Sequence, residues 1–537
     1  MRGKQQFEKL AHKLLWWCNS TIVIYTMIML SAFPFYLKES YRSARTDKYH
    51  FFVVVTLAMA IVVLAIYFVY VLNKIKYKSK LDFAERYNRK KLNAVDISLL
   101  LFWLITVIST ICATVSGGEF AAFFSGSMGR NMGLLMITML VVAYFSVSGF
   151  FCYKRGFFWF VLFAMAMMSI IAIVNYYYLD PLYLFAKYKS NANVIKNFTT
   201  TIGNKNYLSA MICVTLPLAM GLGIVTKDKI TRVLSYICVG IQFMALIVAT
   251  SDGGFLGCFA GIMALFVLST RDVKRLSRFF QCAGIIVLSS KILWLFDLLM
   301  KGNNKGYTSF SRIFIYDNRL FILIPVFFGL AYYFSKLKDD SGKISKALFI
   351  SAVSLTLVIV LIFVSLFVYF TSNTDIKVGE FTSFFRFDEN WGTHRGFFWI
   401  NAFEMFGDFT LREKLFGVGP DNFVEPFLVF DKELIQKYNE THADAAHNVY
   451  INYLITYGIL GAVFYVSFIA FSLWGVIRNA TKNPLAFAVV GAIVAFTFQD
   501  IVNIANPVNT PWLFILIAIS QACYLKVNTP SYSNEVL

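Results

Sequence analysis

Charged residues are scarce in this chain, which has 49 Lys and Arg and 30 Asp and Glu among 537 residues, or 15% in all. A soluble globular protein carries about 25% charged residues, and hydrophobic residues here reach 58%. The composition therefore excludes an ordinary soluble fold and predicts a polytopic integral membrane protein. The net charge of +19 sits mainly in short loops between apolar runs, so it indicates topology and contact with membrane lipid, not nucleic-acid binding.

Cysteine is missing from every long polar segment. All eight cysteines lie within or at the ends of apolar runs, and none falls in residues 371–447, the longest polar segment. The acidic residues of that segment are scattered, with no spacing typical of metal ligands. We therefore expect no disulfide framework, no metal and no cofactor.

Apolar runs long enough to cross about 30 Å of hydrocarbon recur along the chain, and they predict an all-α fold with about 12–14 transmembrane helices. The run that follows the basic N-terminus is too long for a signal-peptide core, so we expect a retained first helix. The predicted spans are residues 14–37, 51–72, 96–116, 132–152, 157–179, 207–225, 233–250, 254–270, 279–299, 320–335, 347–370, 448–477, 484–500 and 511–525.

These spans divide the chain into five predicted parts. They are an N-terminal transmembrane hairpin with a basic cytoplasmic loop (1–95), a transmembrane core (96–370), a large extracytoplasmic loop (371–447), C-terminal transmembrane helices (448–525) and a cytoplasmic tail (526–537). The short loops on the side of the N-terminus are all net positive, which predicts that both termini are cytoplasmic. Within the large loop, residues 396–406 predict an amphipathic helix lying along the membrane surface.

His447 lies where this loop re-enters the membrane. An imidazole exchanges protons near neutral pH, and the start of a helix favours its neutral form, so His447 is a candidate acid or base. The alternative is an interfacial histidine that only anchors a helix. Asn448 follows it, and Gly458 and Gly461 come after nine further residues.

The wider pattern around His447 is specific. Arg395, Trp399, the turn Gly417-Val418-Gly419-Pro420, His442 and then His447-Asn448 follow one another in the loop. This order, with the HN-x9-GxxG signature, resembles the O-antigen ligase and polymerase family of bacterial membrane glycosyltransferases.

Two earlier stretches extend the resemblance. Residues 203–210 (GNKNYLSA) are similar to a GNxNxLA segment of the family, and residues 126–135 (GSMGRNMGLL), which contain Arg130, are similar to a stretch of its polymerases. The resemblance implies a lipid-dependent, GT-C-like architecture in the bacterial inner membrane, with an extracytoplasmic active site.

The implied chemistry is metal-independent, inverting transfer of a glycan from undecaprenyl diphosphate to an acceptor hydroxyl. His447 would be the base, Arg395 would bind the diphosphate, and Arg130 would be a second phosphate contact. Trp399 would hold sugar or lipid, and Asn448 and His442 are further candidates for substrate contact, with a structural role as the alternative for His442. Gly458 and Gly461, on one face of a continuous helix, would let a neighbouring helix approach and fix the angle of His447.

Asp252 departs from the family pattern. Many members have an arginine in a TxSRG stretch, where this chain has Thr250-Ser251-Asp252-Gly253-Gly254. Asp252 would orient Arg395 or an acceptor hydroxyl, and Arg130, Arg312 and Arg319 are candidates to replace the missing arginine. Asp500, at the end of an apolar span, is a candidate to face the same outer cavity.

Within the family the sequence favours a polymerase that extends a cell-surface polysaccharide. The alternatives are an O-antigen ligase acting on lipid A core and a protein O-oligosaccharyltransferase. A transporter of lipid-linked oligosaccharide is the alternative from another class, and it would not require His447. The implied partners are the lipid-linked donor, a glycan, lipid A core or protein acceptor, membrane lipid, a flippase and a chain-length regulator.

Overall fold

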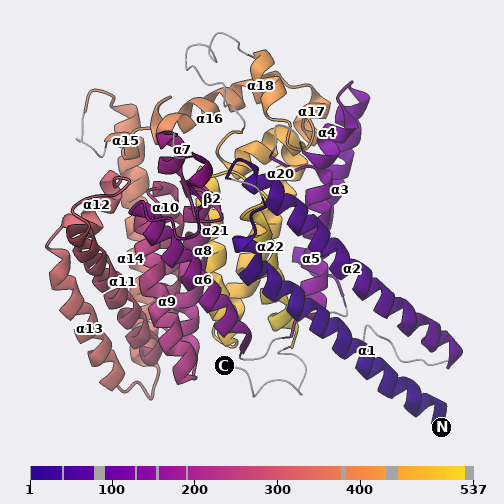
Figure 1. The fold of residues 1–537 in the computed structure, drawn as a ribbon, viewed down its shortest axis with the longest axis horizontal. Coiled ribbons are helices and arrows are strands. Elements are labelled where there is room, and N and C mark those ends of the chain that lie inside the picture. The colour runs from indigo at the N-terminus through magenta and orange to yellow at the C-terminus, as the bar shows by residue number, and fades with distance from the viewer. Residues whose placement is uncertain are drawn as a thin grey trace.

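The computed structural model describes residues 2–38, 41–77, 91–126, 130–152, 156–188, 191–376, 382–430 and 445–526. Within these ranges the chain is almost entirely helical, and the strands are β1 (Phe198–Thr199) and β2 (Gly203–Asn204), which pair antiparallel. The predicted all-α class is therefore confirmed (Figure 1).

The helices alternate between long apolar segments and short connecting pieces. The long ones are α1 (Arg2–Met27), α2 (Ala44–Lys76), α3 (Ala94–Val115), α5 (Leu134–Phe150), α6 (Gly156–Tyr176), α8 (Lys205–Val225), α9 (Lys229–Val248), α10 (Asp252–Ser269), α11 (Val273–Leu299), α13 (Leu320–Lys336), α14 (Lys343–Ser372), α16 (Trp391–Asp408), α20 (Val449–Asn479), α21 (Pro484–Gln499) and α22 (Thr510–Lys526). The short ones are η1 (Ile28–Ala32), η2 (Phe33–Phe35), η3 (Tyr41–Ser43), α4 (Phe120–Ser125), η5 (Ala186–Tyr188), α7 (Ala192–Asn197), α12 (Ser309–Tyr316), α15 (Thr382–Phe385), α17 (Leu411–Phe416), α18 (Val424–Phe430) and η7 (Asp500–Val502).

Eleven apolar segments among the described residues are long enough to cross a membrane. Helices α12 and α13 meet at 71° and form a twelfth if they are one broken span, and α5 and the Thr510–Ala522 part of α22 are shorter apolar helices. Each predicted span falls on one of these helices. The upper predicted number of 14 is reached only when both shorter helices are counted.

Helix α8 lies at the centre of the molecule, against α10 and α21. Every residue of α8 from Leu208 onward is buried, as expected of a helix that is covered on all sides. Small residues let the three backbones come close, since a Cβ atom on Gly257 or Gly261 of α10 would overlap backbone atoms of α21. Close packing of this kind is typical of membrane helices. Van der Waals contact drives their association, and small residues let the backbones approach closely.

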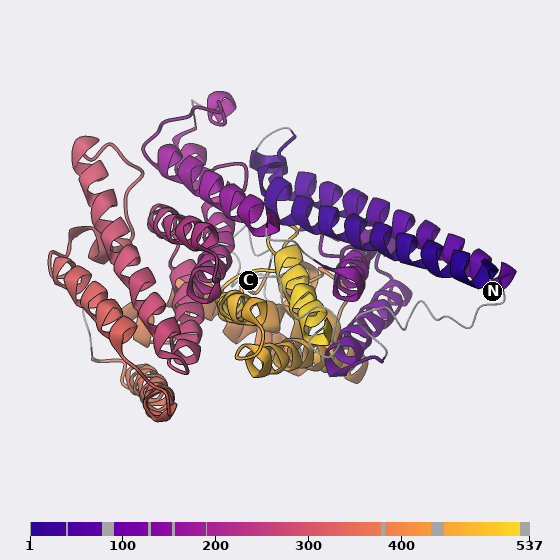
Figure 2. The same cartoon turned by 90° about the horizontal axis from the view of Figure 1, so that it is seen from below.

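The periphery is packed much less. The α1–α2 hairpin extends away from the bundle (Figure 1), and in the view from below α14 stands apart from the other helices (Figure 2). Only Ser345 and Ala352 of α14 are buried. Among the described residues, the core therefore lies in α8, α10, α21 and the helices packed against them, and not in α14.

The segment 371–447 gathers at the upper end of Figure 1 as α15, α16, α17 and α18. The predicted helix at 396–406 lies within α16, and its apolar face packs against protein. Its apolar face forms a cluster with α18 and the start of α20, namely Phe397, Phe398, Ala402, Met405, Phe423, Phe427, Ala446, Ile451 and Ile455. Protein, rather than the membrane surface, covers this face.

Helix α20 is broken at Gly458, which corrects the expectation of a continuous helix. Gly458 has φ 68° and ψ −174°, and Gly417 has φ 76° and ψ −173°, a conformation open essentially to glycine alone. The two glycines lie against each other's segments, because a Cβ on Gly458 would overlap Leu415 and a Cβ on Gly417 would overlap Thr456. The amides of Val418 and Gly419 donate to the carbonyls of Ile455 and Thr456, at 3.2 Å each.

The two glycine motifs of the sequence, at 417–419 and 458–461, therefore meet at this break in α20. The turn at 417–419 takes up carbonyls that a helical break leaves without partners. Gly461 contributes differently, since a Cβ there would meet Tyr457 of its own helix and Ile105 of α3.

Replacing Gly458 with alanine should destabilise the protein by about 2 kcal/mol, because alanine would be strained at this φ and ψ and its Cβ would displace α17. Gly407→Ala is the matched control, since a Cβ at Gly407 meets nothing within 4 Å. The thermal unfolding midpoint in detergent should fall by several degrees for Gly458→Ala only. Equal midpoints for both variants would contradict the role given to this glycine.

Candidate active site

A cavity of about 280 Å³ lies where the ends of several helices meet. Its described lining residues are Arg130, Asn204, Asn206, Tyr207, Ser251, Gly253, Arg395, His447, Gln499, Val502, Asn503 and Ile504. The cavity therefore brings together His447, Arg395 and Arg130, three residues that the sequence predicts to share a site and that are spread over more than three hundred positions.

The backbone around His447 is fixed on both sides. His447 itself has φ 51°, a conformation that non-glycine residues rarely adopt and that is enriched at functional sites. Asn448 caps α20, since its side chain accepts hydrogen bonds from the amides of Tyr450 and Ile451. Before it, the indole Nε1 of Trp399 donates to the carbonyl of Ala446 at 3.0 Å.

Arg395 follows a kink in α16, where Gly392, Thr393 and His394 all have positive φ. Its Nη1 donates to the carbonyl of Gly392 at 2.6 Å, and its buried Nε has no hydrogen-bond partner among the described residues. Burial lowers the pKa of the guanidinium, and the negative charge of Asp252 acts in the opposite direction. An arginine stays charged despite such a shift, so this side chain offers a buried positive charge with a free donor.

Arg130 lies in the connection between α4 and α5 and is 3% exposed. This connection is tied to the large loop, because the amide of Met132 donates to Asp421 Oδ2 at 3.3 Å. Asp421 follows the turn at 417–420, so the connection that carries Arg130 is held against the large loop.

Three helices begin at the cavity. Asn204 caps α8, Ser251 precedes α10, and Asn448 caps α20 beside His447. The positive end of each helix dipole and its first amides favour an anion there. Together with the buried Arg130 and the partly buried Arg395, this makes the cavity suited to a group with several negative charges.

Of the other predicted contact residues, Asp252, Trp399 and Asn448 do not line the cavity. Asp252 is the first residue of α10 and accepts a hydrogen bond from Thr308 at 3.0 Å. Trp399 and Asn448 hold the backbone on either side of His447, as described above. His442 lies outside the described residues.

Two of the three candidates for the missing arginine, Arg312 and Arg319, also lie outside this cavity. Arg319 is exposed and pairs with Asp317 at 2.6 Å, and neither Arg319 nor Arg312 lines the cavity, whereas Arg130 does. Asp500 is buried beside it and accepts a long hydrogen bond from Tyr465, at 3.5 Å. The neighbouring Gln499 lines the cavity in its place, and the sequence alone does not single out that residue.

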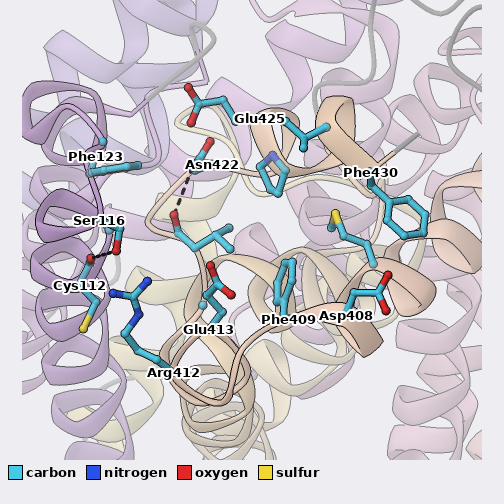
Figure 3. Close-up of a pocket in the computed structure, with 17 residues that line it drawn as sticks. Cys112, Ser116, Phe123, Asp408, Phe409, Arg412, Glu413, Asn422, Glu425 and Phe430 are labelled. Atoms are coloured by element: carbon cyan, nitrogen blue, oxygen red, sulfur yellow. Dashed lines mark hydrogen bonds between the residues drawn. The ribbon is translucent and has the colours of Figure 1, made fainter. Parts of the chain in front are cut away.

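A larger cavity of about 530 Å³ lies between α3–α4 and α16–α18 (Figure 3). Its charged lining residues are Asp408, Arg412, Glu413 and Glu425, set among aromatic and aliphatic side chains. Within the described part of the chain, none of the residues that the sequence marks for chemistry lines it. The smaller cavity is therefore the candidate active site.

Residues 307–466 match the family model described as O-antigen ligase. The chain contains an O-antigen ligase family domain. This domain includes α16, the turn at 417–420 and the first half of α20, and with them Arg395 and His447. The family resemblance seen in the sequence is thus confirmed, and the match supports an enzyme of glycosyltransferase type in a membrane. No curated protein sequence matches the chain.

Trp399→Phe should lower the transfer rate of the O-antigen ligase family domain by about tenfold, because it removes the hydrogen bond that positions the residue before His447. Trp103→Phe is the control, since it removes a comparable indole bond, to Thr138 Oγ1 at 3.0 Å, and neither of these residues lines the cavity. We expect the control to keep its rate within about twofold. Equal losses in both would show that Trp399 acts only on stability.

Asp252→Asn should raise the affinity of the purified protein for pyrophosphate by about threefold, because a negative charge beside Arg395 is removed while the acceptor for Thr308 is kept. Titration calorimetry would measure this affinity. Asp408→Asn is the control, since Asp408 is an exposed acid that does not line the candidate active site. Weaker binding would instead mean that Asp252 organises Arg395 for the anion.

Proposed function

We propose that this protein is a polymerase of a cell-surface polysaccharide. It transfers undecaprenyl-diphosphate-linked glycan repeat units to an acceptor sugar hydroxyl at the extracytoplasmic face of the bacterial plasma membrane. The observation that carries the proposal is the shared cavity of His447, Arg395 and Arg130, at the start of three helices. Both termini are cytoplasmic in this proposal, as the positive short loops indicate.

The reaction needs a base. A sugar hydroxyl is a weak nucleophile until its proton is taken, and a neutral imidazole within about 2.6–3.2 Å can take it. His447 fills this role, with its position set by Trp399 and the Asn448 cap. The hydroxyl oxygen then forms a bond to the anomeric carbon, on the face opposite the diphosphate, so that the configuration is inverted.

The leaving group needs a positive environment. As the bond between the anomeric carbon and the phosphate oxygen breaks, negative charge builds up on the diphosphate. The guanidinium groups of Arg395 and Arg130 and the helix N-termini stabilise that charge. In this mechanism they do what a metal ion does in other transferases.

The polymerase is favoured over the ligase by Arg130. The stretch around this residue is the one similar to polymerases of the family, and its side chain lines the cavity. It supplies a second arginine where Asp252 replaces the usual one.

The test is the length of surface polysaccharide in a deletion strain complemented with the wild type, His447→Ala or Arg395→Gln at equal membrane levels. Loss of the base in His447→Ala lowers rates by about 10²–10⁴-fold, and Arg395→Gln removes a charge that stabilises the leaving diphosphate. Both variants should therefore leave single repeat units on lipid. His50→Ala and Arg319→Gln are matched controls on exposed residues and should restore full-length polymer.

Other outcomes separate the alternatives. Long chains that accumulate on lipid without reaching their acceptor would identify a ligase. Normal polymer in both variants would overturn the catalytic assignment and favour transport.

A further inference from the structure

Gln499 is a buried amide that faces the candidate active site. It is the last residue of α21, is 3% exposed, and lines the cavity that holds the arginines and His447. Its stem is confined by α10, because a Cβ on Gly257 would lie 2.8 Å from the Cβ of Gln499. The start of the Gln499 side chain is therefore held against α10 at the cavity wall.

The Oε1 atom of Gln499 is buried without a hydrogen-bond partner among the described residues. Native proteins rarely leave such an acceptor unsatisfied, because its lost hydration is not recovered. At the wall of a cavity, a bound ligand is a natural source of the missing donor. The ligand group must carry a hydrogen, which ionised phosphate oxygens do not.

The surrounding wall has the same character. Asn503, 8% exposed, lies four residues further along the chain and also lines the cavity, as do Asn204 and Asn206. Neutral amides both donate and accept, and sugar hydroxyls do the same. The cavity thus has two chemically different parts, arginines for phosphate and amides for hydroxyl groups.

We propose that Gln499 and Asn503 form a subsite for the sugar next to the diphosphate of the lipid-linked donor. The Oε1 atom of Gln499 accepts a hydrogen bond from a hydroxyl of that sugar, while Arg395 and Arg130 hold the phosphates. This inference rests on the proposed function and adds the residues that recognise the glycan.

The experiment compares two ligands for the purified full-length protein in lipid nanodiscs. One is undecaprenyl diphosphate, and the other is the lipid-linked repeat unit extracted from the deletion strain. Gln499→Met keeps the length of the side chain and removes its acceptor. It should weaken binding of the repeat unit by about threefold to tenfold and leave binding of undecaprenyl diphosphate within about twofold. Asn503→Ala should show the same selectivity, and it serves as the second variant if Gln499→Met folds poorly.

Gln521→Met is the matched control. Gln521 is a glutamine of the same burial, 3% exposed, on α22, and it accepts a hydrogen bond from Asn93 at 3.0 Å. It does not line the cavity, so both affinities should stay within about twofold of the wild type. A melting curve for each variant separates lost recognition from lost folding.

The subsite is overturned if Gln499→Met and Asn503→Ala weaken both ligands equally or neither. It is also overturned if the wild type binds the repeat unit no more tightly than undecaprenyl diphosphate. Arg395→Gln tests the underlying function separately, because it should weaken both ligands. If Arg395→Gln leaves undecaprenyl diphosphate binding unchanged, the proposed function itself fails.

Discussion

The burial of positive charge at the helix ends that form the candidate active site is the constraint on which the rest of the structure depends. An arginine removed from water is costly, as the lowered pKa of Arg395 indicates. The fold accepts this cost at a cavity where three helix N-termini add to the positive potential. Gly257 and Gly261 allow α8, α10 and α21 to pack closely. This packing places the starts of α8 and α10 beside the end of α21. A site of this kind is unfavourable when empty and is stabilised by an anion.

The large loop, residues 371–447, carries Arg395 and His447, and backbone contacts hold it in place. The turn at 417–419 binds the break at Gly458, and Trp399 binds the carbonyl of Ala446. Arg395 and His447 lie on separate segments, α16 and the start of α20, and the apolar cluster around Phe398 and Ile451 packs these segments together. Their proximity is therefore a property of the folded loop and not of the membrane helices alone.

Much of this could be predicted from the sequence. Apolar runs are long and uninterrupted, so each predicted span lies on a helix, and the family motifs pointed to His447, Arg395 and Arg130, which the structure brings to one cavity. The break at Gly458 could not be predicted, because a glycine within an apolar run does not reveal its φ. Trp399 bonds to a backbone carbonyl 47 residues away, and no side-chain pattern encodes such a partner. Gln499 is a single amide at the end of an apolar helix, so its burial and its unsatisfied oxygen become visible only in three dimensions.

The break in α20 places one short stretch between two environments. Before the break, the carbonyls of Ile455 and Thr456 accept hydrogen bonds from the amides of Val418 and Gly419, while Tyr453 and Tyr457 of the same stretch pack into the main helical core. This stretch therefore ties the large loop to the transmembrane helices. His447 and Arg395, the two residues proposed for catalysis, both lie on the loop side of the single glycine at which the stretch ends.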